Sequence, residues 1–394
     1  MINKVSISNF KSIYKQDIEL GRINVFIGEN GSGKSNILEA IAMAAASNDD
    51  EINTEGLFNR GVRVAKPSLT FNSFLGVQSR NEIKIDIDDN GTLINSILTS
   101  SNPDDIYASW DDTGANYSDK YFYKRALEIQ GLLAKGVMIE MPDRDEMLAV
   151  FERHKRDKQG QSDNENSKIF ISDFLIYNIN SNALRGINNE SKKQPLGLNG
   201  EGLDILLSTF SKEQLQELKD SNFISWLKDI HVDIGDGLKV NGFKLGRSTS
   251  ELYFTDKYMQ KKNNMFAAEN ANEGALHVLF YLALFISEKT PSFFAIDNIE
   301  TALNPMLCRQ LMKRITELAP VHQKQALITT HNPAVIDGLN LHDPEQRLFV
   351  VKRTDEGHTK VERIKLKPEV KNEDLKLSEL WMRGYLGALP SNIF

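Results

Sequence analysis

The chain has 394 residues, 40% of them hydrophobic and 26% charged, with a formal net charge of −7. This length predicts one large domain with an insertion or subdomain, and the acidic balance argues against a surface broadly dedicated to nucleic acid. The single cysteine, Cys308, excludes an intrachain disulfide, the N-terminus lacks signal-peptide features, and no apolar run is long enough to cross a bilayer. These features predict a soluble, cytoplasmic protein that makes no use of a membrane.

The first predicted strands are Lys4–Ile7 and Ile23–Ile27, and a glycine-rich loop and a helix over Lys34–Ala46 follow the second. The loop, Gly28–Ser35, has the pattern G-x4-G-K-[ST] of a phosphate-binding loop. Because glycines carry no Cβ, backbone amides can converge there on a polyphosphate, and the helix adds the positive end of its dipole.

The phosphate loop predicts ATP and Mg²⁺ as ligands. We expect Lys34 to reach the β- and γ-phosphate oxygens and the Ser35 hydroxyl to bind Mg²⁺. The loop residues expected to hold the nucleotide are Asn30, Gly31, Ser32, Gly33, Lys34, Ser35 and Asn36.

Further along, a hairpin is predicted from Ile83–Ile87 and Thr92–Leu98, joined by an Asp-Asp-Asn-Gly turn. Helical periodicity dominates the centre of the chain, and two short strands follow it. The predicted helices are Tyr121–Lys135, Glu146–Lys158, Gly202–Phe210 and Glu213–Ile230, and the strands are Leu238–Lys244 and Glu251–Thr255.

The last third alternates helices with apolar strands, which is typical of a parallel sheet covered on both faces. Its predicted elements are the helix Ala271–Ser287, the strand Phe293–Ile296, the helix Pro305–Leu318, the strand Gln325–Thr329, and a hairpin from Leu348–Lys352 and Lys360–Ile364. We divide the chain into an N-terminal ATPase lobe (1–99), a mainly helical insertion (100–235) and a C-terminal ATPase lobe (236–394).

Two polar residues follow the apolar strands of this last third. Asp297 follows Phe293–Ile296, which is the Walker B pattern, and we expect its carboxylate to hold Mg²⁺ together with Ser35. His331 follows Gln325–Thr329, where a histidine can contact the γ-phosphate and report its presence.

Taken together, these motifs resemble the ABC-type ATPases of the overcoming-lysogenization-defect, RecF and structural-maintenance-of-chromosomes groups. The chain looks most similar to stand-alone ATPase subunits of bacterial anti-phage systems of the Septu and PARIS type. The stretches that carry the resemblance are Ile7–Ser12, the phosphate loop with Asn36, Asn59–Arg63, Asn272–Gly274, Asp297–Pro305 and Thr330–Val335. The resemblance implies an α/β ABC-ATPase head, in which a mixed sheet core and an antiparallel β subdomain carry a helical insertion.

The resemblance also assigns roles in catalysis and exposes one departure. Most ABC ATPases have a glutamate after the Walker B aspartate to polarise the attacking water, and this chain has Asn298. An amide can orient water but cannot accept its proton. Either hydrolysis is slow and Asn298 helps to retain ATP, or Glu300 is the base.

Self-association follows from the same resemblance. Asn272, Glu273 and Gly274 precede a helix at the place of the signature motif, which binds the γ-phosphate of the other subunit's nucleotide; the alternative is a plain helix cap. The resemblance therefore implies a dimer or larger assembly with shared ATP sites. The stretch after His331 is too short for the TOPRIM nuclease domain of some relatives, so we expect a separate effector, a nuclease or a toxin.

Two other functions were weighed. A DNA-clamping repair ATPase of the RecF kind remains an alternative, although the acidic charge disfavours it. A transporter subunit does not fit the Asn-Glu-Gly signature. The short basic pair Lys261-Lys262 is interpreted as solvated. Arg60, Arg63 and Arg185 could contact phosphate or a partner, and the alternative, which we favour, is that they are solvated or structural.

Overall fold

The computed structural model describes residues 1–76, 80–105, 108–114, 171–187, 196–220, 223–233, 250–366 and 376–386. The predicted helices Tyr121–Lys135 and Glu146–Lys158 and the strand Leu238–Lys244 lie outside these residues. Among the described residues, no helix combines the length and the apolar composition needed to span a bilayer.

A mixed six-stranded sheet forms the centre of the molecule, with the strand order β14-β13-β3-β12-β11-β7. Four of the five neighbouring pairs in this order are parallel, and only β14 pairs antiparallel, with β13. Its strands are β3 (Ile23–Ile27), β7 (Ile176–Tyr177), β11 (Phe293–Ile296), β12 (Gln325–Thr329), β13 (Gln346–Arg353) and β14 (Thr359–Ile364). The bounds of β3, β11 and β12 are those predicted from the apolar runs.

Both faces of this sheet are buried, as the uninterrupted apolar strands predicted. In β11, Phe294 and Ile296 join one hydrophobic cluster, whereas Phe293 and Ala295 join another. The first cluster contains the helices α8 (Glu273–Ile286) and α9 (Pro305–Val321), and the second contains α1 (Lys34–Asn48). The strands are therefore covered by α8 and α9 on one face and by α1 on the other.

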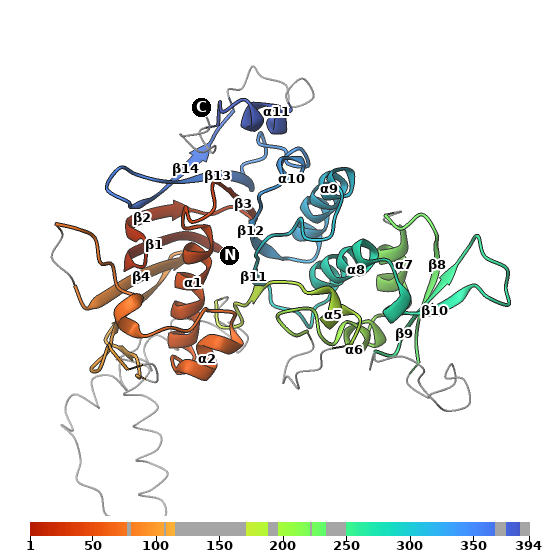
Figure 1. The fold of residues 1–394 in the computed structure, drawn as a ribbon, viewed down its shortest axis with the longest axis horizontal. Helices are drawn as coiled ribbons and strands as arrows, with labels where there is room; N and C mark the ends of the chain where they lie inside the picture. The colour runs from red at the N-terminus through yellow and green to blue at the C-terminus, as the bar shows by residue number, and fades with distance from the viewer. Residues whose placement is uncertain are drawn as a thin grey trace, which may run out of the picture.

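A five-stranded antiparallel sheet packs on the α1 side, with the order β2-β1-β4-β5-β6. It lies at one end of the molecule in Figure 1. Its strands are β1 (Ile2–Phe10), β2 (Ile13–Glu19), β4 (Glu82–Asp89), β5 (Thr92–Thr99) and β6 (Asp111–Asp112). The buried Gln325 side chain ties this sheet to β12, because its amide bonds both the nitrogen and the oxygen of Ile2 at 2.9 and 2.7 Å.

A three-stranded antiparallel sheet, β10-β9-β8, lies at the opposite end of the longest axis (Figure 1). Its strands are β8 (Leu227–Val232), β9 (Leu252–Asp256) and β10 (Met265–Ala267). The predicted helix Glu213–Ile230 is wrong in its second half, because α7 (Lys212–Asp220) ends early and β8 pairs with β9. Strand pairing with a distant segment overrides the local helical pattern there.

Short helices complete the described fold. They are α2 (Thr54–Asn59), α5 (Ser181–Leu184), α6 (Leu203–Ser208), α10 (Pro333–Ile336) and α11 (Leu377–Met382). Of these, α5 and α6 pack beside α8, whereas α10 lies between α9 and α11.

Candidate functional site

The phosphate loop is held in shape by its contacts with β13 and the start of β14. Gly28 and Gly33 have φ angles of 150° and 108°, which favour glycine. A Cβ on Gly28 would lie 2.1 Å from the oxygen of Val351, and one on Gly33 would lie 2.2 Å from Thr359 Oγ1. These two positions thus require glycine because the neighbouring strands approach closely, and glycine also lets the backbone amides approach a phosphate.

Lys34 starts α1 and its side chain is buried, being only 6% exposed. Its Nζ donates to the carbonyl oxygens of Gly28 and Glu29, both at 2.9 Å. Burial lowers the pKa of Lys34 to about 8, although the carboxylates of Asp297, Glu300 and Glu29 oppose this shift. The Lys34 ammonium group is thus held by two neutral carbonyl oxygens, and a charged phosphate oxygen can attract it more strongly than they do.

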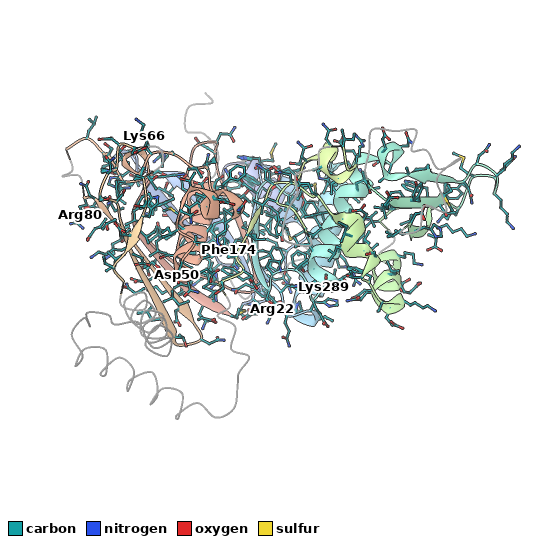
Figure 2. The ribbon with its side chains drawn as sticks, turned by 90° about the horizontal axis from the view of Figure 1, so that it is seen from below. Arg22, Asp50, Lys66, Arg80, Phe174 and Lys289 are labelled. Atoms are coloured by element: carbon teal, nitrogen blue, oxygen red, sulfur yellow. The ribbon has the colours of Figure 1, made fainter. Side chains whose placement is uncertain are left out.

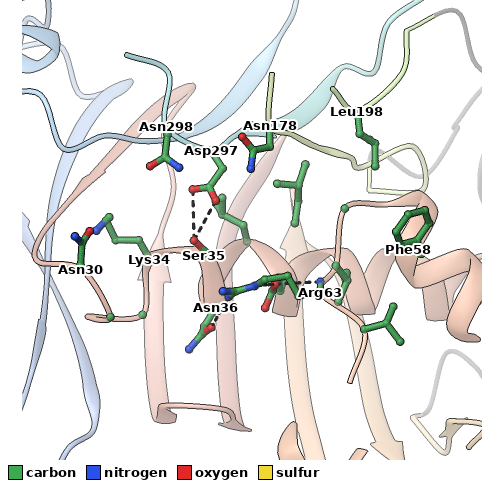
Figure 3. A pocket seen from close by; sticks show the side chains of 18 of the residues that line it. Asn30, Lys34, Ser35, Asn36, Phe58, Arg63, Asn178, Leu198, Asp297 and Asn298 are labelled. Carbon is green, nitrogen blue, oxygen red and sulfur yellow. Dashed lines mark hydrogen bonds and ion pairs between the residues drawn. The ribbon is translucent and has the colours of Figure 1, made fainter. Parts of the chain in front are cut away.

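Ser35 and Asp297 meet at the mouth of the loop, as predicted for a magnesium site (Figure 3). The Ser35 hydroxyl lies 3.1 and 3.4 Å from the two carboxylate oxygens. Thr329, at the end of β12, also donates to this carboxylate, and its hydroxyl accepts the backbone amide of Asn298 at 2.9 Å. A strand neighbour therefore orients the acid towards Ser35.

The donor set fits Mg²⁺. Hydroxyl and carboxylate oxygens are the hard ligands that this ion prefers, and it usually takes only one or two from the protein. No three His, Cys, Asp or Glu side chains cluster as metal ligands in the described residues. When bound with ATP, the ion would neutralise charge on the phosphate oxygens.

Asn298 and Glu300 have different surroundings. Asn298 has a φ of 59° and lines the pocket, next to Asp297 in Figure 3. Glu300 is absent from the pocket lining; its carboxylate accepts from the Thr330 hydroxyl and the His331 amide, each at 2.8 Å. Glu300 thus stabilises the turn that carries His331.

His331 borders the pocket with an exposed side chain. Partial burial, together with the charge of Lys34, lowers its pKa despite the opposing carboxylates of Glu300 and Asp297. This lowered pKa favours the neutral imidazole, which can donate one hydrogen bond to a phosphate without adding a charge.

One cavity of about 770 Å³ joins most of the predicted residues. It is bordered by Asn30, Gly31, Gly33, Lys34, Ser35, Asn36, Asp297, Asn298 and His331. Ser32 does not border it; it is 2% exposed and its Oγ has no hydrogen-bond partner. The phosphate loop and the ends of β11 and β12 therefore converge on one space of a size suited to a nucleotide.

The structure adds Arg63 to this pocket, a residue that the sequence left as solvated or structural. Its Nε lies 2.6 Å from Glu39, and its Nη2 donates to the Asn36 side chain at 3.2 Å. Glu39 is buried and also bonds Lys11, so one carboxylate holds a cation on each side of α1. Arg60, in contrast, is buried and paired with Asp49, which is a structural role.

Asn178, which the sequence analysis missed, also lines the pocket. It follows β7, the strand that pairs with β11, and so reaches the same sheet edge as Asp297. A signal was present: Phe174–Tyr177 is an apolar run that ends in a polar residue, as does Phe293–Ile296. A strand of two residues was too short to be recognised from its pattern.

The predicted signature residues do not border the cavity. Asn272 and Glu273 are exposed, and Asn272 caps α8 by accepting the amide of Ala275 at 3.2 Å. A Cβ on Gly274 would lie 3.1 Å from the oxygen of Ala302, so the signature segment packs against the loop after Asp297.

The low pKa of Lys34 predicts pH-dependent ATP binding. Phosphate attracts only the protonated ammonium, so affinity should be full below pH 8 and fall by roughly tenfold per pH unit above it. Titrations of ATP between pH 7 and 9.5 measure this. Lys34→Ala should bind weakly at every pH with a flat profile, and a flat profile in the unaltered protein would contradict the assignment.

The chain matches the family model described as AAA ATPase domain over residues 1–336. No curated protein sequence gives a significant match. Among solved structures, it is similar to an SMC head bound to the C-winged helix domain of ScpA, with a TM-score of 0.54 and 14% identity over 93% of this chain and 98% of that one.

Two further SMC heads are similar at lower scores. One, from Thermotoga maritima, has a TM-score of 0.47 and 12% identity, covering 93% of this chain and 99% of that one. The other, with an extended coiled coil and bound to the C-terminal domain of ScpA, derived from Pyrococcus furiosus, has a TM-score of 0.49 and 14% identity over 92% and 96%.

The likeness at a TM-score of 0.54 shows the fold, a mixed α/β head of the ABC and SMC type with an antiparallel β subdomain. The family match spans the phosphate loop, Asp297 and His331. Together with the geometry around Lys34, it establishes that this chain belongs to the AAA ATPase domain family and has an SMC-like head fold.

Proposed function

We propose that the chain is a slow ATPase that pairs with a second copy around ATP and acts as the nucleotide-switched scaffold or sensor of an anti-phage complex with a separate effector. The observation that carries its nucleotide chemistry is the convergence of Lys34, Ser35 and Asp297 on one cavity. Backbone amides, one ammonium group and one metal site are the parts that phosphoryl transfer to water requires.

Slow turnover is proposed from the position of the two candidate bases. The residue beside Asp297 that faces the cavity is Asn298, which cannot accept a proton. Glu300 could accept one, but its two oxygens already accept hydrogen bonds from Thr330 and His331. A water molecule in the cavity can therefore be oriented without being deprotonated efficiently.

Asn298→Glu should raise the ATPase kcat, by about tenfold or more, because it places a carboxylate where the amide faces the cavity. Glu300→Gln keeps the size of the side chain and should lower kcat only a few-fold, since an amide oxygen can still accept from Thr330 or His331. Steady-state phosphate release at saturating ATP measures both variants. If Glu300→Gln abolished turnover while Asn298→Glu left it unchanged, Glu300 would be the base.

Pairing around ATP is proposed from the location of the signature segment. Asn272 and Glu273 are exposed at the start of α8 and lie outside the cavity of their own chain. A helix N-terminus of this kind attracts phosphate, so a second copy's nucleotide is a suitable ligand. Met306, just after the adjoining loop, is 69% exposed and offers apolar area for such a contact.

ATP should therefore convert monomers to dimers, and Glu273→Trp should block this by steric conflict while ATP still binds. Analytical ultracentrifugation with and without ATP and Mg²⁺ measures the mass, and a fluorescent ATP analogue measures binding. Lys289→Trp, at another exposed site beyond the other end of α8, is the matched control. ATP-dependent dimers of Glu273→Trp would exclude this surface.

The role in phage defence is proposed from the sequence resemblance. The similar SMC head is described as bound to a domain of a separate protein, ScpA. Such heads can therefore serve as platforms for other proteins, and we extend this to the present chain.

Purification of the chain from its native cells should yield a second protein, a nuclease or a toxin, in near-equal amount. The pair should separate, or the effector should become active, after infection, and Lys34→Ala should alter the association because the nucleotide state controls it. Mass spectrometry before and after infection measures this. Purification of the chain alone, with hydrolysis stimulated by DNA, would favour a repair ATPase instead.

A further inference from the structure

The loop between β9 and β10 forms the outermost part of the three-stranded sheet, and it extends away from the body of the molecule (Figures 1 and 2). Every residue from Lys257 to Asn263 is exposed. This tip, residues 257–263, takes no part in the nucleotide cavity or in the signature segment.

The tip has a defined conformation, because the chain anchors it at both ends. Asp256 donates its amide to the oxygen of Asn264 at 2.7 Å, and Lys257 donates to the oxygen of Trp226 at 2.9 Å. Tyr258 donates its amide to the Asp256 carboxylate at 2.7 Å. The backbone of the tip would therefore lose little conformational entropy when a partner binds.

An aromatic cluster supports the base of the hairpin. Trp226 packs against Phe254 and Phe266, with ring centroids 6.0 and 5.3 Å apart. The hydrophobic residues needed to hold the sheet together are therefore at its base, and those at the tip are not explained by packing.

The net charge of the tip is positive, whereas that of the whole chain is negative. Lys257, Lys261 and Lys262 lie within six residues, no acidic residue occurs from 257 to 267, and the whole chain has a net charge of −7. Such a local concentration of positive charge attracts a polyanion to this part of an otherwise acidic chain.

Two large hydrophobic side chains beside these lysines are exposed to solvent. Tyr258 is 72% exposed and Met259 is 59% exposed. The Nζ of Lys257 lies 5.1 Å from the Tyr258 ring centroid, so the cation covers one face of the ring. The exposed ring offers a flat surface of the size that a nucleobase stacks on.

We propose that the β9–β10 tip binds nucleic acid that has at least one unpaired base. The three lysines contact the phosphates, and the base stacks on Tyr258, which is the combination used for single strands. An acidic protein segment would satisfy the lysines but would leave the exposed ring without a partner. This function goes beyond ATP hydrolysis and does not depend on dimerisation.

Binding of a fluorescein-labelled 30-nucleotide single strand by the full-length protein tests this, by anisotropy at several salt concentrations. Replacing Lys257, Lys261 and Lys262 together with Gln should make the slope of log affinity against log salt shallower by about 2. Each phosphate contact on a single strand contributes about 0.7 to the magnitude of this slope, and the triple variant loses three such contacts. The control replaces Lys212, Lys289 and Lys313 with Gln; these exposed lysines lie elsewhere, and Figure 2 shows Lys289 well away from the hairpin.

The tyrosine is tested separately. Tyr258→Ala should weaken binding by about tenfold, within the range for one stacked base, whereas Tyr258→Phe should bind as the unaltered protein does. ATP affinity should be unchanged in all these variants, which shows that the fold is intact.

Four results would overturn the proposal. They are no binding of the single strand, equal loss in the two lysine triples, equal affinity for a blunt duplex of the same length, or tighter binding of poly-glutamate than of the single strand. The last would identify an acidic protein as the partner of the tip.

Discussion

The site depends on four parallel neighbours, β3, β12, β11 and β7, which end at the same edge of one sheet. Each strand delivers a different group there. The phosphate loop follows β3, Asp297 follows β11, β12 ends at Thr329, and Asn178 follows β7. Since parallel strands place their carboxyl ends together, segments far apart in the chain meet without long side chains having to bridge a gap.

Packing on both faces keeps that edge in place. Alternate residues of each central strand enter two separate hydrophobic clusters, one with α8 and α9 and the other with α1 and the antiparallel sheet. Small displacements would disturb both clusters, because protein interiors are close-packed. The hydrogen bonds from Ser35 and Thr329 to Asp297 then orient one carboxylate from two directions. The sheet thus holds Asp297 and Ser35 together at the edge of the cavity.

The residue after Asp297 in the pocket is an amide, not an acid. Asn298 faces the cavity, and the nearby Glu300 stabilises the turn at Thr330 and His331. The same carboxylate would therefore link any movement of the histidine to the loop after β11. This arrangement is compatible with a protein that responds to whether ATP is bound rather than to rapid ATP hydrolysis. The proposed switch is based on that response.

The sequence by itself determined the phosphate loop, the strands β3, β11 and β12 with their bounds, and the pairing of Ser35 with Asp297, because long apolar runs and fixed motif spacing are local signals. It could not place Arg63 or Asn178 in the cavity, separate the surroundings of Asn298 and Glu300, or detect that β8 replaces the end of a predicted helix. Those outcomes depend on contacts between residues distant in the chain, and only the tertiary structure decides them, since strand pairing and burial override local propensity.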